Sequence, residues 1–231
     1  MICSRNLVLG ALVFWIGVFC QCEEINSQSC TQNEDDKENN IRVLGDPILS
    51  TPCRQLSLEE IKSDKVKTAI EVGHRELASF RARSGFGRAI AAPQFGYSIQ
   101  LICLFLDNKR ITMINPAITY RSPDTFQMWD DCLSFPHLMA AVERHSSISV
   151  SFVDEEGRTQ EWTALPQDVS ELLQHEIDHL EGVLAVDKAV DPIYGECAGR
   201  ECSGIVARSE WLANKALYDT YLQRDGIGLR A

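Results

Sequence analysis

Apolar residues recur every three or four positions over residues 57–83, which predicts a long amphipathic helix. Ser57 is followed three positions later by Glu60, the spacing of a capping box, so we expect this helix to begin at Ser57. A similar spacing over residues 209–223 predicts a C-terminal helix. Both helices need a partner surface for their apolar faces.

The region between these helices has the patterns of β-strands. Two apolar runs, at residues 101–106 and 111–114, flank a polar tetrapeptide and predict a β-hairpin. Further strands are expected at residues 117–120, 140–143, 147–152 and 159–164. Strands clustered between helices predict an α+β domain.

The first forty residues comprise two segments of different composition. Residues 1–22 contain an apolar run behind a single positive charge, Arg5, which is typical of a signal or targeting segment. The run is shorter than the roughly 20 apolar residues that span a membrane. Residues 23–40 are polar and acidic without periodicity and are expected to form a disordered linker. We therefore expect the folded domain to comprise residues 41–231.

The composition excludes some classes of function. The net charge is −11, so the chain lacks the basic surplus that drives broad binding to nucleic acids or anionic membranes. Nine cysteines are scattered along the chain, and their odd number does not predict a disulfide framework. Cys197 and Cys202 could pair in an oxidising compartment, and free thiols are expected in a reducing one.

One stretch contains the pattern H-E-x-x-H. On a helix, His175 and His179 lie on the same face and can bind one metal ion. Glu176 lies beside them, where its carboxylate can accept a proton from water. This helix is predicted to begin at Ser170 and to stop at Gly182. The alternative is a buried helix whose two histidines only form hydrogen bonds.

A catalytic metal site of this kind usually has three protein ligands and an open position for water. Two other segments can contribute to it. Residues 85–94 are rich in small residues, and Gln94 can donate an amide hydrogen bond. A later segment contains Cys132, whose thiolate is a soft metal ligand. His137 and His145 are expected to be structural or surface residues.

Three motifs, in this order, resemble the peptide deformylase family. They are Ala91-Ala92-Pro93-Gln94, Cys132-Leu133-Ser134 and Gln174-His175-Glu176-Ile177-Asp178-His179-Leu180. The resemblance covers residues 41–190, and the three motifs in order are far more specific than any one of them. It implies an α+β fold in which antiparallel sheets pack around a central metal-binding helix.

The resemblance also implies roles for particular residues. Glu176 would be the general base and then the general acid, while Gln94 and the backbone N–H of Leu133 would hold the formyl oxygen as it becomes an oxyanion. The ligands of one divalent metal ion would be Cys132, His175 and His179. The residues that contact the substrate would be Gly87, Ala89 and Ile90. The metal is expected to be iron(II), with zinc, nickel or cobalt able to replace it.

The implied reaction is metal-dependent hydrolysis of the N-formyl group from the N-terminal formyl-methionine of newly made polypeptides, which releases formate. The partners are then N-formyl-methionyl nascent chains, with transient proximity to the ribosome and no direct nucleic-acid binding. The implied location is an organelle that starts translation with formyl-methionine, a mitochondrion or a plastid. The apolar leader instead favours the secretory pathway or a membrane anchor. No oligomeric state is predicted.

Five positions depart from the family pattern, of which Ile90, in place of a common leucine, is the mildest. Arg88 stands where the family has an apolar residue, and Ala89 where it has glycine. Asp130 and Asp131 replace Glu-Gly before the cysteine, and the turn would be strained if Asp131 needed a positive φ. These changes affect substrate preference and rate more than metal binding. They motivate a second hypothesis, a catalytically weak deformylase-like binding protein.

A zinc-type peptidase is the third hypothesis, because it shares H-E-x-x-H. Gly182 extends the match to a longer peptidase pattern, but the next ligand position holds Ala185 instead of histidine. The remaining carboxylate ligands would be Glu196 or Glu201, which lie in a Gly/Cys-rich segment without an evident helix. The secretory-like N-terminus favours this hypothesis.

Overall fold

The computed structural model describes residues 40–190, 204–220 and 222. The predicted leader, most of the acidic linker, Cys197, Cys202 and the alternative ligands Glu196 and Glu201 lie outside the described residues. Within the described part of the chain, no helix combines the length and apolar character that crossing a membrane requires.

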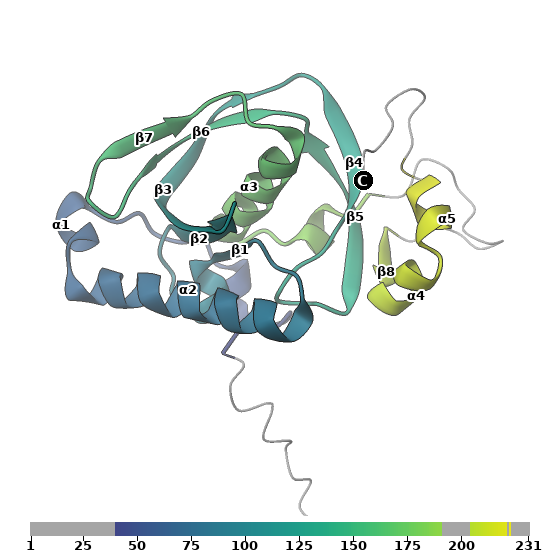
Figure 1. Ribbon diagram of the computed structural model, residues 1–231, viewed down its shortest axis with the longest axis horizontal. Coiled ribbons are helices and arrows are strands. Elements are labelled where there is room, and N and C mark those ends of the chain that lie inside the picture. Colours follow the sequence, from purple (N-terminus) through teal and green to yellow (C-terminus); the bar gives the residue numbers. More distant parts are fainter. Residues whose placement is uncertain (1–39, 191–203, 221, 223–231) are drawn as a thin grey trace, which may run out of the picture. The chain divides into compact units, whose positions relative to one another are not determined.

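Two antiparallel sheets form the centre of the domain (Figure 1). The first has the strand order β1-β2-β3-β6-β7, and the second has the order β4-β5-β8. The bounds of the first sheet are β1 (Ala89–Ala91), β2 (Leu101–Leu106), β3 (Lys109–Arg121), β6 (Ile148–Val153) and β7 (Thr159–Trp162). Those of the second are β4 (Thr125–Asp130), β5 (Leu138–His145) and β8 (Ile205–Ala207). Together with the helices, these sheets confirm the predicted α+β class.

The predicted hairpin is confirmed by the pairing of β2 with β3. Its two-residue turn consists of Asp107 and Asn108, whose φ angles are 49° and 59°. Aspartate and asparagine tolerate this left-handed region better than most residues, and such turns match the twist of antiparallel strands. β1, β4 and β8 were not predicted from the sequence.

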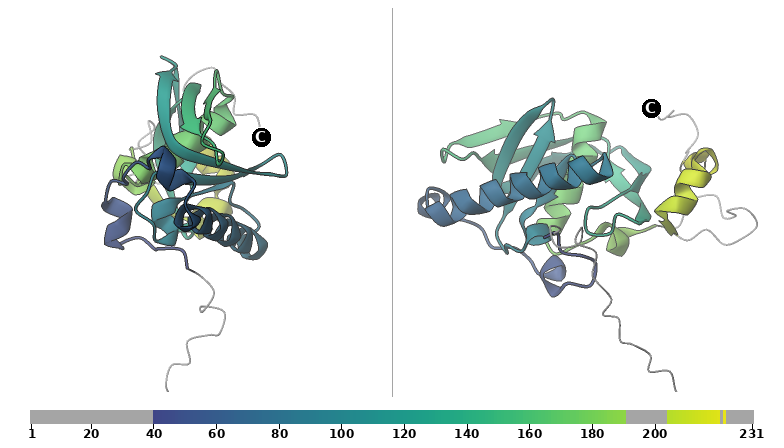
Figure 2. Two further views of the ribbon diagram at one scale, coloured as in Figure 1. Left: turned by 90° about the vertical axis from the view of Figure 1, so that its left-hand side faces the viewer. Right: turned by 60° about the horizontal axis from the view of Figure 1, so that its bottom comes forward.

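The helices cover both faces of the first sheet. Their bounds are α1 (Leu58–Ile61), α2 (Asp64–Ser84), α3 (Gln167–Leu180), α4 (Arg208–Ala213) and α5 (Lys215–Thr220), and the short 3-10 turns are η2 (Pro47–Ser50), η3 (Ala92–Phe95) and η4 (Ala185–Lys188). Side chains alternate along β2, so that Leu101 and Cys103 pack with α2 while Ile102 and Leu104 pack with α3. Figure 1 shows α3 enclosed by the curved sheet, with α2 along the outer side of β1 and β2, and Figure 2 shows α2 from two further directions.

The long N-terminal helix is interrupted, which corrects the prediction of one helix from residue 57. Ser57 and Glu60 do form the predicted capping box, but it caps only α1. Ser63 then caps α2, because its hydroxyl accepts from the Val66 N–H at 3.3 Å and donates to the Glu60 carbonyl at 2.6 Å. The predicted C-terminal helix is likewise divided, at Asn214, whose side chain donates to the Glu210 carbonyl at 3.1 Å.

The prediction that α3 begins at Ser170 is wrong. Its first helical residue is Gln167, which follows Pro166. Ser170 is fully buried, and its hydroxyl donates to the His145 carbonyl at 2.8 Å instead of capping the helix. Gln174 makes a second link to the same carbonyl at 2.9 Å. These hydrogen bonds fix α3 against the end of β5.

The predicted stop at Gly182 is confirmed. Gly182 has a φ of +75°, and the next N–H, from Val183, donates to the Asp178 carbonyl at 2.9 Å. The end of α3 also meets the N-terminal part of the domain, because the Cys53 N–H donates to the Leu180 carbonyl at 2.8 Å.

Replacing Gly182 by alanine tests this close contact. A Cβ at residue 182 would lie 2.9 Å from the carbonyl carbon of Ser50, whereas one at Gly85, which has a φ of +74°, would meet nothing within 4 Å. Both substitutions carry a left-handed backbone cost of about 1–2 kcal/mol. Gly182→Ala should lose about 1–3 kcal/mol more than Gly85→Ala because the Ser50 backbone must move. Urea unfolding measures both, and equal losses would contradict the contact.

Candidate metal centre

Three buried side chains that can bind a metal converge between α3 and the turn that follows β4. They are Cys132, His175 and His179, and their candidate ligand atoms all lie within 4.8 Å of one another. The Cys132 Sγ is 3.2 Å from the His179 Nε2, and the two imidazole rings are 4.9 Å apart. One thiolate and two imidazoles are a donor set that suits zinc or iron(II), so these residues fit a single divalent ion.

A buried ionic network holds His175. The Nδ1 of His175 donates to Asp130 Oδ2 at 2.9 Å, which leaves its Nε2 free for a metal. The same carboxylate oxygen accepts from Arg144 Nη2 at 2.9 Å, and the Arg144 side chain is fully buried. Arg144 also pairs with Asp178, which accepts from Lys188 at 3.0 Å. Asp178 therefore supports the network rather than touching the three candidate ligands.

The network sets the protonation of its members. Burial alone would raise the pKa of Asp130, but His175 and then Arg144 outweigh it and hold that pKa well below its usual value. Burial alone would lower the pKa of His175, but the Asp130 carboxylate raises it well above the usual value. Burial, followed by the neighbouring charge of His175, depresses the pKa of His179. Asp130 thus stays an acceptor that fixes the orientation of His175.

Glu176 is buried beside the cluster. Its Oε2 has no hydrogen-bond partner among the described residues. In the absence of a bound cation, burial raises the pKa of Glu176 to about 7, although the charge of His175 opposes this. A carboxylate with one free oxygen and a pKa near neutrality can both accept and return a proton.

Two hydrogen-bond donors lie next to Cys132. The Gln94 Oε1 accepts from the Ala91 N–H at 2.8 Å, which turns its Nε2 toward Ser134 Oγ at 3.2 Å and Cys132 Sγ at 3.5 Å. The backbone N–H of Leu133 has no acceptor among the described residues. Both donors are therefore placed where an oxygen near the cluster can accept from them.

The N-terminal segment of the domain supports these two turns. The Arg42 N–H donates to the Gln94 carbonyl at 2.7 Å, and the Leu44 N–H donates to the Ser134 carbonyl at 3.0 Å. Backbone hydrogen bonds from one extended segment thus tie together the turns that carry Gln94 and Cys132.

A cavity of about 380 Å³ opens beside His175 and Glu176. Gly87 and Ala89 line it, whereas Ile90 lies on the other face of β1 and packs into the core with α2. The structure therefore does not bring the Ile90 side chain to the cavity.

Asp131 also lines the cavity, and its turn is not strained. The non-glycine residues with a positive φ in the described chain do not include Asp131, so the suspected left-handed conformation does not occur. Its carboxylate pairs with Arg208 at 2.7 Å, and the Arg208 guanidinium lies 4.0 Å from the centre of the Phe86 ring. Neither Arg208 nor Arg144 could be predicted from the sequence, because both act through partners distant in the chain.

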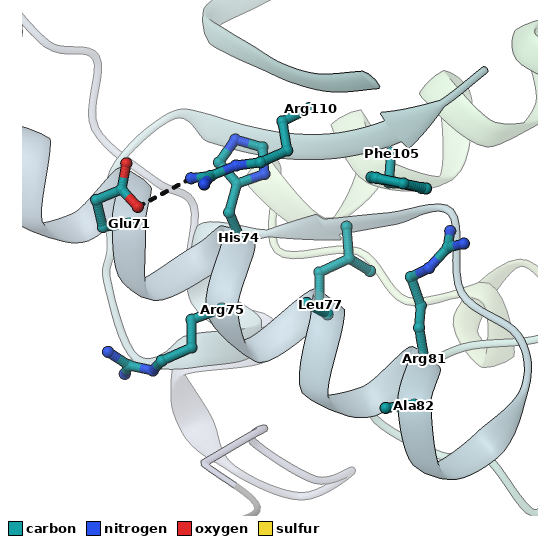
Figure 3. A pocket seen from close by; sticks show the side chains of 9 residues that line it. Glu71, His74, Arg75, Leu77, Arg81, Ala82, Phe105 and Arg110 are labelled. Atoms are coloured by element: carbon teal, nitrogen blue, oxygen red, sulfur yellow. Dashed lines mark hydrogen bonds and ion pairs between the residues drawn. The ribbon is translucent and has the colours of Figure 1, made fainter. Parts of the chain in front are cut away.

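A larger cavity, of about 500 Å³, lies between α2 and the β2–β3 hairpin. Figure 3 shows Arg110 reaching toward Glu71, 3.0 Å away, and Arg81 beside Phe105. None of the motif residues lines this cavity. Although this cavity is the larger of the two, it is not the site of the chemistry of the cluster.

The chain is similar to proteins of a known family. The family model described as polypeptide deformylase matches residues 38–193. A peptide deformylase of Dictyoglomus thermophilum is 34% identical over 151 residues, which cover 65% of this chain and 92% of that protein. The chloroplastic peptide deformylase 1A of Solanum lycopersicum is 32% identical and covers 62% of this chain and 57% of its own length.

Solved structures show the same similarity. The peptide deformylase of Synechococcus elongatus in complex with actinonin has a TM-score of 0.59 and 34% identity, and covers 65% of this chain and 78% of its own. The peptide deformylase of Thermotoga maritima has a TM-score of 0.59 and 31% identity, and covers 65% of this chain and 96% of its own.

The pKa of Glu176 predicts a pH-dependent loss of stability in the metal-free protein. The folded state favours the protonated carboxyl, so its contribution is complete below about pH 4.5 and is lost as the pH rises through about 7. Glu176→Gln has no carboxyl to ionise. Its free energy of unfolding, relative to that of the parent, should therefore rise by about 3 kcal/mol from pH 4.5 to above pH 7.

Urea unfolding in the presence of a chelator, repeated across this pH range, measures the gain. Glu181→Gln, at the exposed end of α3, is the matched control and should change the free energy of unfolding by less than about 0.5 kcal/mol. A constant difference between Glu176→Gln and the parent would show that the carboxyl is not perturbed by burial.

Proposed function

The chain belongs to the polypeptide deformylase family, which removes the N-formyl group from newly made polypeptides, and we propose that the reaction takes place at Cys132, His175 and His179. The family match confirms the predicted enzyme class, a peptide deformylase that acts on formyl-peptide substrates. The observation that carries the proposed site is the buried Glu176, with one carboxylate oxygen unpartnered beside three candidate ligands.

Deformylases bind a divalent metal ion, and the chain has a donor set that fits one. We propose that the native ion is iron(II), with zinc, nickel or cobalt as replacements, because a thiolate and two imidazoles bind all of them. When bound, the ion supplies Lewis acidity that makes water a usable nucleophile near neutral pH.

The residues of the chain divide the remaining work. Glu176 accepts a proton from the attacking water and returns it to the leaving nitrogen, and burial beside the cluster raises its pKa toward the range that suits both steps. The Gln94 Nε2 and the Leu133 N–H donate to the formyl oxygen as negative charge develops on it. Asp130 holds His175 in the orientation that presents its Nε2 to the cluster.

The alternatives to this site have less support. In a peptidase of the longer H-E-x-x-H pattern, the residue at position 185 would be a ligand, but Ala185 is a buried core residue of η4. The non-catalytic hypothesis rests on the departures at residues 88, 89, 130 and 131. The change at residue 130 gives this hypothesis little support, because Asp130, although shorter than the glutamate it replaces, still accepts a hydrogen bond from His175 at 2.9 Å.

Formate release tests the site. The purified protein, loaded anaerobically with iron(II) or nickel, should release formate from a formyl-methionyl peptide. Glu176→Gln should bind the same amount of metal but lose at least about 100-fold in kcat, because the proton acceptor is removed. Glu181→Gln should retain the parent rate. Metal binding without formate release by the parent would favour the deformylase-like binding protein.

The location is proposed to be an organelle that starts translation with formyl-methionine. A plastid has the support of the relative from Solanum lycopersicum that is named chloroplastic, and a mitochondrion satisfies the same chemistry. Transient proximity to the ribosome follows because the substrates are nascent chains. A fluorescent fusion to the C-terminus should colocalise with an organelle marker, and a signal confined to the secretory pathway would contradict this proposal.

A further inference from the structure

The cavity beside Glu176 is the space that the residue carrying the formyl group would fill. Its volume of about 380 Å³ has room for one side chain and the adjoining backbone. Much of its lining is apolar and comes from Ala89, Met128, Leu133 and Leu172. An apolar side chain suits this part of the lining.

One wall of the cavity is ionic. The Arg88 Nη2 donates to Glu171 Oε1, and the Arg88 Nη1 donates to the Asp168 carbonyl at 2.8 Å. The Glu171 side chain is 10% exposed and that of Arg88 is 42% exposed, so the carboxylate is buried while the guanidinium lies at the mouth of the cavity, partly open to water. Arg88 precedes β1 and Glu171 belongs to α3, so two segments distant in the sequence create this wall.

The arginine has hydrogen-bonding capacity to spare. A guanidinium carries five N–H donors, and the two bonds to Glu171 and Asp168 engage two of them. The others have no acceptor among the described residues. A purely apolar side chain packed against this wall would cover donors without replacing their water, which is unfavourable. A side chain that ends in an acceptor would satisfy them.

We infer that Arg88 is a specificity-determining residue that selects formyl peptides whose first side chain is linear and ends in a neutral acceptor. This inference rests on the proposed function. A thioether sulfur is a weak acceptor, whereas the oxygen of methionine sulfoxide is polar and strong. Norleucine has the same length and no acceptor. The expected order of preference is therefore methionine sulfoxide, methionine, norleucine. An acidic side chain is disfavoured, because Glu171 and Asp131 already place carboxylates at the cavity.

Peptide binding to the full, metal-free chain tests this order without turnover. Formyl tripeptides that begin with methionine sulfoxide, methionine or norleucine and are otherwise identical are titrated by calorimetry. The sulfoxide peptide should bind about tenfold more tightly than the norleucine peptide, as expected for a hydrogen bond to a charged donor. In Arg88→Met the ratio should fall to about one or below, since the donors are gone. Arg88→Lys, which keeps a charged donor, should retain part of the ratio.

Two further variants separate the wall from general effects of charge. Arg110→Met removes an arginine whose ion pair with Glu71, at 3.0 Å, lies outside this cavity, and it should keep the parent ratio. Glu171→Gln keeps an acceptor for Arg88 and should keep the order of the three peptides. Equal binding of the sulfoxide and norleucine peptides by the parent, or an unchanged ratio in Arg88→Met, would overturn the inference. Failure of the parent to bind any of the peptides would also overturn it.

Formate release by the metal-loaded parent separates this inference from the proposed function. If the three peptides bind in the expected order but none yields formate, the catalytic proposal fails and the assignment of Arg88 stands. If formate is released from all three with equal kcat/KM and equal affinity, the catalytic proposal stands and the assignment of Arg88 fails.

Discussion

The pairing of the Asp130 carboxylate with the buried Arg144 guanidinium and the His175 imidazole is the interaction on which the centre depends. Removing a carboxylate and a guanidinium from water is costly, and it is tolerated here because each group has a charged partner at hydrogen-bond distance. The side chains of this arrangement link β4, β5 and α3. It also determines which nitrogen of His175 is free. A change that left either charge unpaired would therefore affect the fold and the metal site together.

The burial of α3 limits which polar side chains the helix can carry. The helix is buried on most of its surface, so it can carry polar side chains only where each of them finds a partner or a ligand. Gln174 meets the His145 backbone, His175 meets Asp130, and Glu176 keeps one free oxygen. The buried side-chain atoms of α3 without a partner among the described residues are Glu176 Oε2 and His179 Nδ1, and both belong to the proposed reaction site, as expected where function overrides the satisfaction of buried polar groups.

The sequence was most informative where spacing alone determines geometry. Residues four apart on a helix share a face, so the proximity of His175 and His179 was predictable, as was the stop at Gly182. The β2–β3 hairpin was predictable for the same reason, because the chemistry of its turn is local. Cys132 could be placed beside these histidines only through the resemblance to a family.

What the sequence could not provide depends on partners that are far apart in the chain. Arg144 reads as an ordinary polar residue of a strand, and only the pairing of β4 with β5 brings it to Asp130. Ser170 is of a residue type that often caps helices, but in the folded domain its hydroxyl donates to the His145 carbonyl instead. Arg88 was noticed as a departure, whereas its engagement with Glu171 required the fold.

The hydrogen bonds from Arg42 and Leu44 to the turns of the centre limit how far the chain can be shortened from its N-terminal side. Truncation that removes Arg42 would leave the Gln94 carbonyl without its donor, and truncation that also removes Leu44 would leave the Ser134 carbonyl without its donor. The metal centre thus extends its demands on the chain to a segment that contributes no side chain to it.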